Sequence, residues 1–459
     1  MKRTGWLAVA VATSMAIAAC SSSGSGKSGL GGTTPTTSKK NACTGKTLTA
    51  SEVGISPSQI TVTVVADTGN PLKPGLFQGS VDGVKAWAAS VNANGGLACR
   101  KVNVLTHDSF LTADEAKNGV TTACTTSVAL VGTTALSLND MRPVEGCKDK
   151  AGAATGIPDL PVLQTEPAEQ CSPVSFAVIP NGGSCPYTKG LRNFQSVTPA
   201  VEWFKKNVSP DLHGVFVVPS DLPSTITAST PIFTAITRDG VKMDAEFGAS
   251  AFFTQSQYTP IIQSIKSHKA TWVMNGLDYS GTMAMRKEAA AQGVDSVKVW
   301  ACSLQCYTTT FLSEGGSAVE GQYSWMQFLP FEDKGSNDAL DTFLQYDTKP
   351  DSFGLQAFSA GMLFQQVVEA IVAKSGPNAI TRQAILAQIR TVHDFDAGGL
   401  LVKTDIAGHN PSPCILIMHV KNHAWVRVDP LKPGTFDCDQ PSAITKLTID
   451  PLKAYHPVG

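Results

Sequence analysis

The chain has 459 residues, of which 42% are hydrophobic and 16% are charged, and its formal net charge is -1. Its 36 basic and 37 acidic residues leave no excess of positive charge, which argues against nucleic acid and against a polybasic contact with a membrane surface. A chain of this length exceeds the limit of about 250 to 300 residues at which single hydrophobic cores stop growing, so two lobes are expected.

The N-terminus has the pattern of an export signal. Lys2 and Arg3 precede a nearly uncharged run over residues 5–19, and small residues stand directly before Cys20. The run is shorter than the about 20 apolar residues that a membrane helix needs. We therefore predict a bacterial lipoprotein with a signal peptide over residues 1–19 and an acylated, palmitate-bearing Cys20. Such a protein is anchored in the cell envelope, on the outer face of the cytoplasmic membrane or its periplasmic side.

The segment after the signal differs in composition from the rest of the chain. Residues 21–42 are mainly Ser, Gly, Thr and Lys, which cannot bury apolar surface. We predict a lipid-anchored flexible tether over residues 20–57. No later segment is expected to enter a bilayer, so the lipid is the one predicted membrane contact.

From residue 60 onward, runs typical of strands alternate with apolar residues at helical spacing. In the first half, strands are predicted over residues 60–66, 101–105, 127–131, 161–163 and 176–180, and helices over 77–92, 112–126 and 138–147. A helix over residues 187–207 then precedes strands over 214–219, 242–247, 271–275 and 297–300, with helices over 229–239, 259–267 and 280–292. Helices over 355–374 and 381–390 and strands over 415–420 and 424–428 complete the series. This order predicts an α/β fold with two doubly wound parallel-sheet lobes.

Besides Cys20, the chain has ten cysteines. An even number in an exported chain indicates disulfides. Spacing does not fix their connectivity, but proximity suggests Cys124 with Cys147, Cys171 with Cys185, Cys302 with Cys306 and Cys414 with Cys438, which leaves Cys43 with Cys99. A thiol or metal site is the alternative for Cys302 and Cys306, but no histidine cluster lies nearby. We predict no metal and no cofactor.

Ligands of open α/β sheets bind beyond the carboxyl ends of the strands. In the first half, Thr68 follows the first strand in a long loop that also holds Phe77. Thr134 and Ser137 follow strand 127–131, before a helix whose free N–H groups favour an anion. These side chains are candidates for binding a ligand carboxylate. Helix capping is the alternative role for the hydroxyls.

The second half offers a matching set of loops. Asp278 and Tyr279 follow strand 271–275, and Ser303 follows strand 297–300. Tyr279 could cover an apolar group or a cation, or it could pack within its own lobe. Asp278 could instead cap the helix that starts at residue 280.

Several stretches resemble the leucine-binding-protein-like substrate-binding proteins of ABC transporters, the type I periplasmic binding proteins. The stretch GVKAWAASVNANGGL over residues 83–97, followed by residues 102–108, is similar to the first helix, N-x-x-G-G corner and second strand of that family. Two further landmarks of the family are similar. One is Val131-Gly132 followed by small polar residues, and the other runs from residues 258–260 through 272–273 to Gly293. The resemblance covers residues 60–428.

The resemblance implies a clamp of two lobes with a three-crossing hinge that loads a small solute and presents it to an ABC transporter permease. Lobe 1 would comprise residues 58–186 and 332–396, lobe 2 residues 187–331 and 397–440, and the C-terminal tail residues 441–459. The family's carboxylate-binding positions fall on Ser137 and near Thr165. Asp278, Tyr279 and Ser303 would face the other end of the ligand.

The chain departs from the family at one position. Amino-acid-binding members resemble one another in having an acid after the last of these strands, for the ligand ammonium, whereas this chain has ACSLQ over residues 301–305. Asp278 is the nearest substitute. An amino acid, an amide or a related carboxylate is the predicted solute class.

Two other classes of function are alternatives to this interpretation. An enzyme is not predicted, because the chain has neither His-Glu-x-x-His nor Gly-x-Ser-x-Gly and its eight histidines are scattered. A ligand-sensing lipoprotein without a transport role fits the same fold, since a fold alone does not decide function. A permease and ATPase encoded beside the protein would favour uptake, and a sensor kinase would favour signalling.

Overall fold

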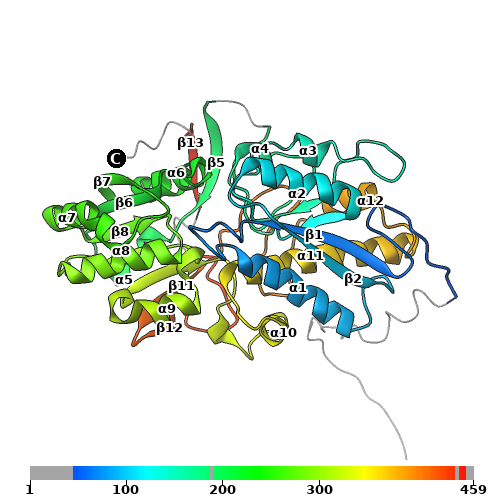
Figure 1. Cartoon of the computed structure of the whole chain (residues 1–459). Helices are drawn as coiled ribbons and strands as arrows, with labels where there is room; N and C mark the ends of the chain where they lie inside the picture. Colours follow the sequence, from blue (N-terminus) through cyan, green and yellow to red (C-terminus); the bar gives the residue numbers. More distant parts are fainter. Residues whose placement is uncertain (1–44, 187–189, 440–443, 451–459) are drawn as a thin grey trace, which may run out of the picture.

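The computed structural model describes residues 45–186, 190–439 and 444–450. The signal peptide, Cys20, Cys43 and most of the predicted tether lie outside these residues. Two β-sheets, each flanked by helices, form the two halves of the molecule (Figure 1).

The first sheet has the strand order β2-β1-β3-β4, and all its pairings are parallel. Its strands are β1 (Gln59–Ala66), β2 (Lys101–Asp108), β3 (Ala129–Val131) and β4 (Asp159–Leu160). The helices of this half are α1 (Gln78–Ala93), α2 (Ala113–Thr126), α3 (Arg142–Glu145), α4 (Pro167–Gln170), α10 (Asp338–Tyr346), α11 (Ser352–Ser375) and α12 (Arg382–Ile389). The central strand β1 is buried along most of its length, as covering by helices on both faces requires.

The second sheet has the order β12-β11-β10-β9-β8-β6-β7. Its strands are β6 (His213–Pro219), β7 (Lys242–Ala249), β8 (Trp272–Asn275), β9 (Val299–Cys302), β10 (Gln322–Met326), β11 (Leu416–Lys421) and β12 (Ala424–Asp429). Its helices are α5 (Val201–Asn207), α6 (Pro223–Arg238), α7 (Thr259–His268), α8 (Tyr279–Ala291) and α9 (Thr309–Gly315). Strands β6 to β10 pair in parallel, but β11 and β12 are antiparallel. The predicted parallel sheet is therefore confirmed for β6 to β10, and β11 and β12 extend it as an antiparallel pair at one edge.

The chain crosses between the two halves three times. It passes from β4 to β6, returns between β10 and α10, and passes again between α12 and β11. Helices α10 and α11 pack against α1 although more than two hundred residues separate them in sequence. The predicted architecture of two α/β lobes joined by three crossings is confirmed.

The predicted helix over residues 187–207 is wrong. Residues Arg192–Val197 form β5, which pairs antiparallel with β13 (Ile444–Ile449), and α5 starts only at Val201. Alternate residues of β5 are buried, which is the period of a strand and not of a helix. Part of the segment predicted as a C-terminal tail is thus a strand.

Four smaller predictions also need correction. The helix over residues 138–147 shrinks to α3, which starts one residue before Pro143. The strand near residue 161 is β4, two residues earlier, and the segment 176–180 forms no strand, although Phe176 N–H donates to Asp159 O at 2.8 Å. Helix α11 is long and apolar enough to cross a membrane by length and composition, contrary to expectation. Because 67% of its apolar window is buried, α11 is typical of the core helix of a globular protein.

Glycines allow α1 and α11 to approach closely. A Cβ atom on Gly83 would lie 2.0 Å from the backbone oxygen of Gly354, and one on Gly361 would lie 2.3 Å from Cδ2 of Trp87. Trp87 is 1% exposed, and its ring meets Phe364 edge-on at 6.0 Å between centroids. This contact fixes α1, whose first turn lies at the site described below.

Four predicted disulfides are confirmed: Cys124–Cys147, Cys171–Cys185, Cys302–Cys306 and Cys414–Cys438. Cys99 is also disulfide-bonded. Cys43 lies outside the described residues, so its pairing with Cys99 stays a prediction.

Candidate ligand-binding site

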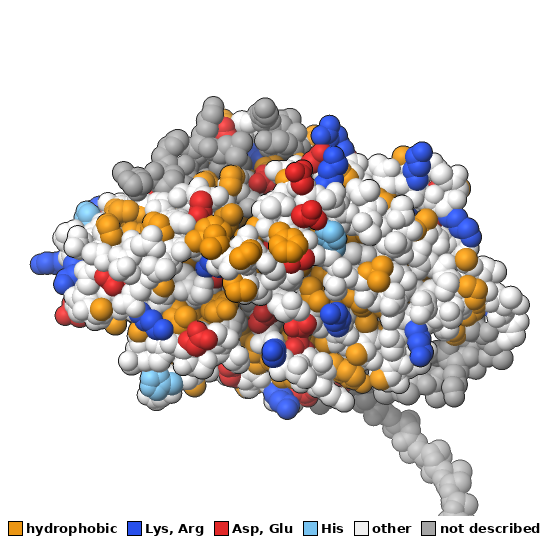
Figure 2. Space-filling view, in the orientation of Figure 1, with side chains coloured by type: hydrophobic (Ala, Val, Ile, Leu, Met, Phe, Trp, Pro, Cys, Tyr) orange, Lys and Arg blue, Asp and Glu red, His pale blue; other side chains and the backbone are white. Residues whose placement is uncertain are grey.

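A cavity of about 690 Å³ lies between the two halves. The first half contributes the loop after β1, the first turn of α1 and the segment after β4, and the second half contributes the loops after β6, β8 and β9. The volume is in the range of small-molecule sites, about 300 to 1,000 Å³. Figure 2 shows hydrophobic and acidic side chains gathered around the middle of one face, where the halves meet.

The structure brings five of the eight predicted ligand-binding residues to this cavity: Phe77, Thr165, Asp278, Tyr279 and Ser303. Thr68, Thr134 and Ser137 do not line it. Thr134 is fully buried, and the Ser137 hydroxyl donates to Leu111 O at 3.0 Å. The Ser137 hydroxyl is therefore engaged elsewhere, and the Thr134 hydroxyl is buried away from the cavity without a hydrogen-bond partner.

The carboxylate of Asp67 hydrogen-bonds to the loop after β3. Its carboxylate accepts from Leu136 N–H at 2.8 Å, from Leu111 N–H at 2.7 Å and from the Ser109 hydroxyl at 2.6 Å. Burial raises the pKa of Asp67, although these hydrogen bonds act in the opposite direction. A backbone N–H that was expected to receive a ligand carboxylate thus binds a carboxylate of the chain itself.

The cavity walls are largely apolar. Phe77 and Phe353 meet edge-on with ring centroids 4.8 Å apart. Further apolar side chains come from both halves: Leu76, Leu111, Leu136, Val162, Leu163, Ile179, Leu222, Ile232, Phe252, Leu304, Trp325 and Met326. Such walls favour a solute with a substantial apolar body, because its burial removes apolar surface from water.

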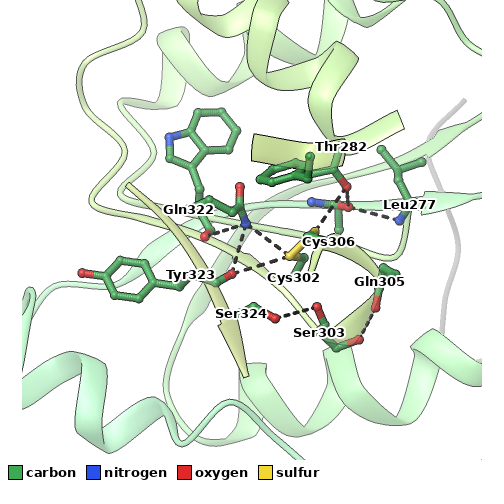
Figure 3. The surroundings of a disulfide bond; sticks show 12 residues. Leu277, Thr282, Cys302, Ser303, Gln305, Cys306, Gln322, Tyr323 and Ser324 are labelled. Carbon is green, nitrogen blue, oxygen red and sulfur yellow. Dashed lines mark hydrogen bonds between the residues drawn. A yellow bond between two sulfur atoms is a disulfide. The ribbon is translucent and has the colours of Figure 1, made fainter. Parts of the chain in front are cut away.

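The Cys302–Cys306 disulfide shapes the loop that carries Ser303 and Gln305 (Figure 3). Both residues line the cavity, and the Ser303 hydroxyl hydrogen-bonds to the side chain of Gln305. The Ser324 hydroxyl donates to Ser303 O at 2.9 Å and ties the loop to β10. The disulfide therefore has a structural role at the rim of the site.

An ion pair joins the two halves beside the cavity. Lys73, in the loop after β1, places Nζ 2.9 Å from Oδ1 of Asp278 and 2.7 Å from Oγ of Ser280. Asp278 also caps α8 by accepting from Gly281 N–H at 3.0 Å. Asp278 was the one predicted substitute for an ammonium-binding acid, but Lys73 already neutralises it.

Two cavity-lining carboxylates were missed by the sequence analysis. Asp82 lies on α1, and Asp351 caps α11 by accepting from Gly354 N–H at 2.6 Å. An aspartate just before the predicted helix 355–374 was a capping signal for Asp351. Nothing in the local sequence indicated that either residue would face a cavity.

The comparisons with known proteins agree with this geometry. Residues 59–424 match the family model described as periplasmic binding protein, so the chain belongs to that family. Its fold is the type I periplasmic binding protein fold. A search of the curated proteins finds no match.

Solved structures of similar fold share little sequence with the chain. The leucine-binding protein LivK from Thermotoga maritima aligns with a TM-score of 0.61 and 15% identity, over 81% of this chain and 97% of that one. A fatty acid ABC transporter substrate-binding protein from Thermomonospora curvata gives 0.61 and 15%, over 88% and 96%. An ABC transporter solute-binding protein from R. palustris, in complex with benzoate, gives 0.60 and 15%, over 83% and 98%.

We expect Lys73→Met to loosen the contact between the halves. The variant removes the ion pair, while Asp278 keeps its capping bond to Gly281. A pair of this partial exposure contributes about 1 kcal/mol, which corresponds to an about fivefold shift toward open forms. Hydrogen–deuterium exchange should rise in residues 67–77 and 276–281. Lys85→Met, at an exposed position of α1, is the control, and equal exchange in both variants would contradict the expectation.

Proposed function

We propose that the chain is an extracytoplasmic solute-binding lipoprotein, anchored through Cys20, that captures a small molecule between its lobes and delivers it to an ABC permease. The observation that carries the proposal is the cavity between the halves, lined by residues from both. Membership of the periplasmic binding protein family supports it. The proposal assigns no catalytic step to the chain.

The mechanism needs a solute that contacts both lobes. A ligand that touches Phe77 and Thr165 on one side and Tyr279 and Ser303 on the other stabilises the closed arrangement over the open one. Its differential affinity for the two forms sets how far the population shifts. Closure then presents the permease with a surface that the open form lacks.

The structural neighbours support an amphipathic solute. These proteins are a leucine-binding protein, a fatty acid-binding protein and a protein in complex with benzoate, and each of these ligands joins a polar head group to an apolar body. The apolar walls of this cavity fit such a body. The predicted polar classes, an amino acid, an amide or a carboxylate, therefore need an apolar portion to fill the site.

Mass spectrometry of the intact protein under native conditions tests the capture of a solute. Protein purified from its own organism should carry a dialysable small molecule that stabilises it by mass action when added back. A mass equal to that of the acylated mature chain alone, with no stabilisation by any cell extract, would contradict the proposal.

The anchor is tested separately. In a Cys20→Ala variant the acylation site is lost, so the mature protein should move from the membrane fraction to the soluble fraction. Without the thiol no lipid can be attached, and stable anchoring depends on acyl chains buried in the bilayer. Fractionation followed by immunoblotting measures the effect, and an unchanged membrane fraction would exclude Cys20 as the anchor.

A further inference from the structure

Three carboxylates converge at one wall of the cavity. Asp82 comes from α1, Asp347 follows α10, and Asp351 caps α11. A Cβ atom on Gly354 would lie 3.2 Å from both Oδ2 of Asp347 and Oδ1 of Asp351. The two carboxylates therefore both lie next to the backbone of Gly354. Asp82 and Asp351 line the cavity, whereas Asp347 is buried beside Asp351 and does not line it.

These carboxylates lack a cationic partner in the described part of the chain. No ion pair links any of the three to a lysine, arginine or histidine of residues 45–186, 190–439 or 444–450. Lys73 is paired with Asp278. Lys349 is exposed, and its contact with Asp347 is a hydrogen bond from its backbone N–H at 2.9 Å. Oδ2 of Asp347, a residue 5% exposed, is buried without a hydrogen-bond partner. Buried negative charge without a partner is costly, so a cation at this wall would be stabilising.

Aromatic rings stand beside the carboxylates. Phe353 is two residues from Asp351, its ring meets Phe77 at 4.8 Å, and Tyr279 lines the cavity from the opposite half. Burial raises the pKa of Tyr279, and the charges of Asp278, Glu314 and Asp351 add to this effect. Aromatic faces next to carboxylates are the surroundings in which proteins bind alkylammonium groups.

The described residues hold no group of three or more His, Cys, Asp or Glu side chains that could hold a metal ion. An organic cation therefore fits this wall better than a metal ion does. Such a group can contact the rings as well as the carboxylates, whereas a metal ion would need several oxygen ligands at short distance.

We propose that the ligand carries a cationic nitrogen, an amine or alkylammonium group, on an apolar body, and that Asp82, Asp351 and the rings of Phe77 and Phe353 receive its cationic end. The inference rests on the proposed capture function, because it names the ligand class of the same cavity. The inference also accounts for the departure from the family pattern at residues 301–305. The acid missing after β9 is replaced by acids of α1 and α11, on the other side of the cleft.

Calorimetric titration of the purified mature protein with three matched probes tests this inference. 2-Phenylethylamine, 2-phenylethanol and 3-phenylpropanoate share a phenyl body and differ in the charge of the head group. The amine should bind at least about tenfold more tightly than the other two, since a charge-assisted contact is lost without its positive charge. Equal or tighter binding of the alcohol or the propanoate would overturn the inference but leave solute capture in place.

Two variants locate the cation. Asp351→Asn removes the charge but keeps a good helix cap, so the protein should fold while amine affinity falls about tenfold. Asp338→Asn, at an exposed position of α10, should leave amine affinity unchanged. Unchanged affinity in Asp351→Asn, or no binding of any probe by the wild type, would overturn the cationic ligand class. Solute capture is decided independently by the co-purified molecule.

The pH dependence gives a further readout. Burial raises the pKa of Asp351 to about 6, and the charges of Asp347 and Asp82 add to this effect. The carboxylate is ionised above that pH and neutral below it, so amine affinity should fall as pH drops from 7 through about 6 toward 5. The other titratable and charged groups around this wall are Asp82, Asp278, Tyr279, Glu314, Asp347, Lys73 and Lys349. Affinity that stays constant across this range, with phenylethanol as the reference, would contradict the role of Asp351.

Discussion

An Asp333→Ala variant should lose about 3–5 kcal/mol of unfolding free energy, because it leaves a buried guanidinium without its partner. Asp333 follows the second crossing between the halves, and its carboxylate is paired with Arg427 on β12. The two side chains are 4% and 7% exposed. The same carboxylate accepts from Gly434 N–H at 2.8 Å, so its loss also frees a second segment.

Chemical denaturation of the purified variant measures this loss. Asp338→Ala, at an exposed position five residues later, is the matched control and should stay within about 0.5 kcal/mol of wild type. A double variant, Asp333→Leu with Arg427→Met, should recover part of the stability because neither charge remains buried. A loss below about 1 kcal/mol in Asp333→Ala would show that the pair is solvated and does not stabilise the hinge region.

A Trp87→Ala variant should lose a similar amount, about 3–5 kcal/mol, through the cavity that it opens between α1 and α11. Trp87 packs against the backbone of α11 at Gly361, and its Nε1–H donates to Gln365 at 3.3 Å. The first turn of α1 carries ligand-site residues, so loosening this helix should also weaken solute binding. Trp87→Phe keeps most of the apolar volume and should lose clearly less. Equal losses in both variants would contradict a packing role and point to the hydrogen bond instead.

Elements with a strong local pattern could be predicted from the sequence. Strand β1 and helix α1 were located to within about two residues because Val and Thr alternation and helical apolar spacing are properties of single segments. The pairing of β5 with β13 could not be predicted from the sequence, because the two strands are about 250 residues apart and each is short. A strand whose partner is distant carries little signal of its own.

The site was predictable only in part, for a related reason. Loops after strands are marked by sequence order, so the placement of Asp278, Tyr279 and Ser303 at the cavity followed from topology. The occupation of the loop after β3 by Asp67 depends on side-chain direction, which spacing does not encode. The convergence of Asp82 with Asp351 likewise depends on how α11 docks on α1.

Small-angle scattering with the co-purified solute tests the central claim most directly. A solute held between two lobes should draw them together, so the radius of gyration of the mature protein should fall as the solute is titrated to saturation. In the Lys73→Met variant the unliganded radius should start larger and the fall should be greater. A scattering curve that stays the same from the solute-free to the saturated protein would contradict closure of the lobes around a ligand.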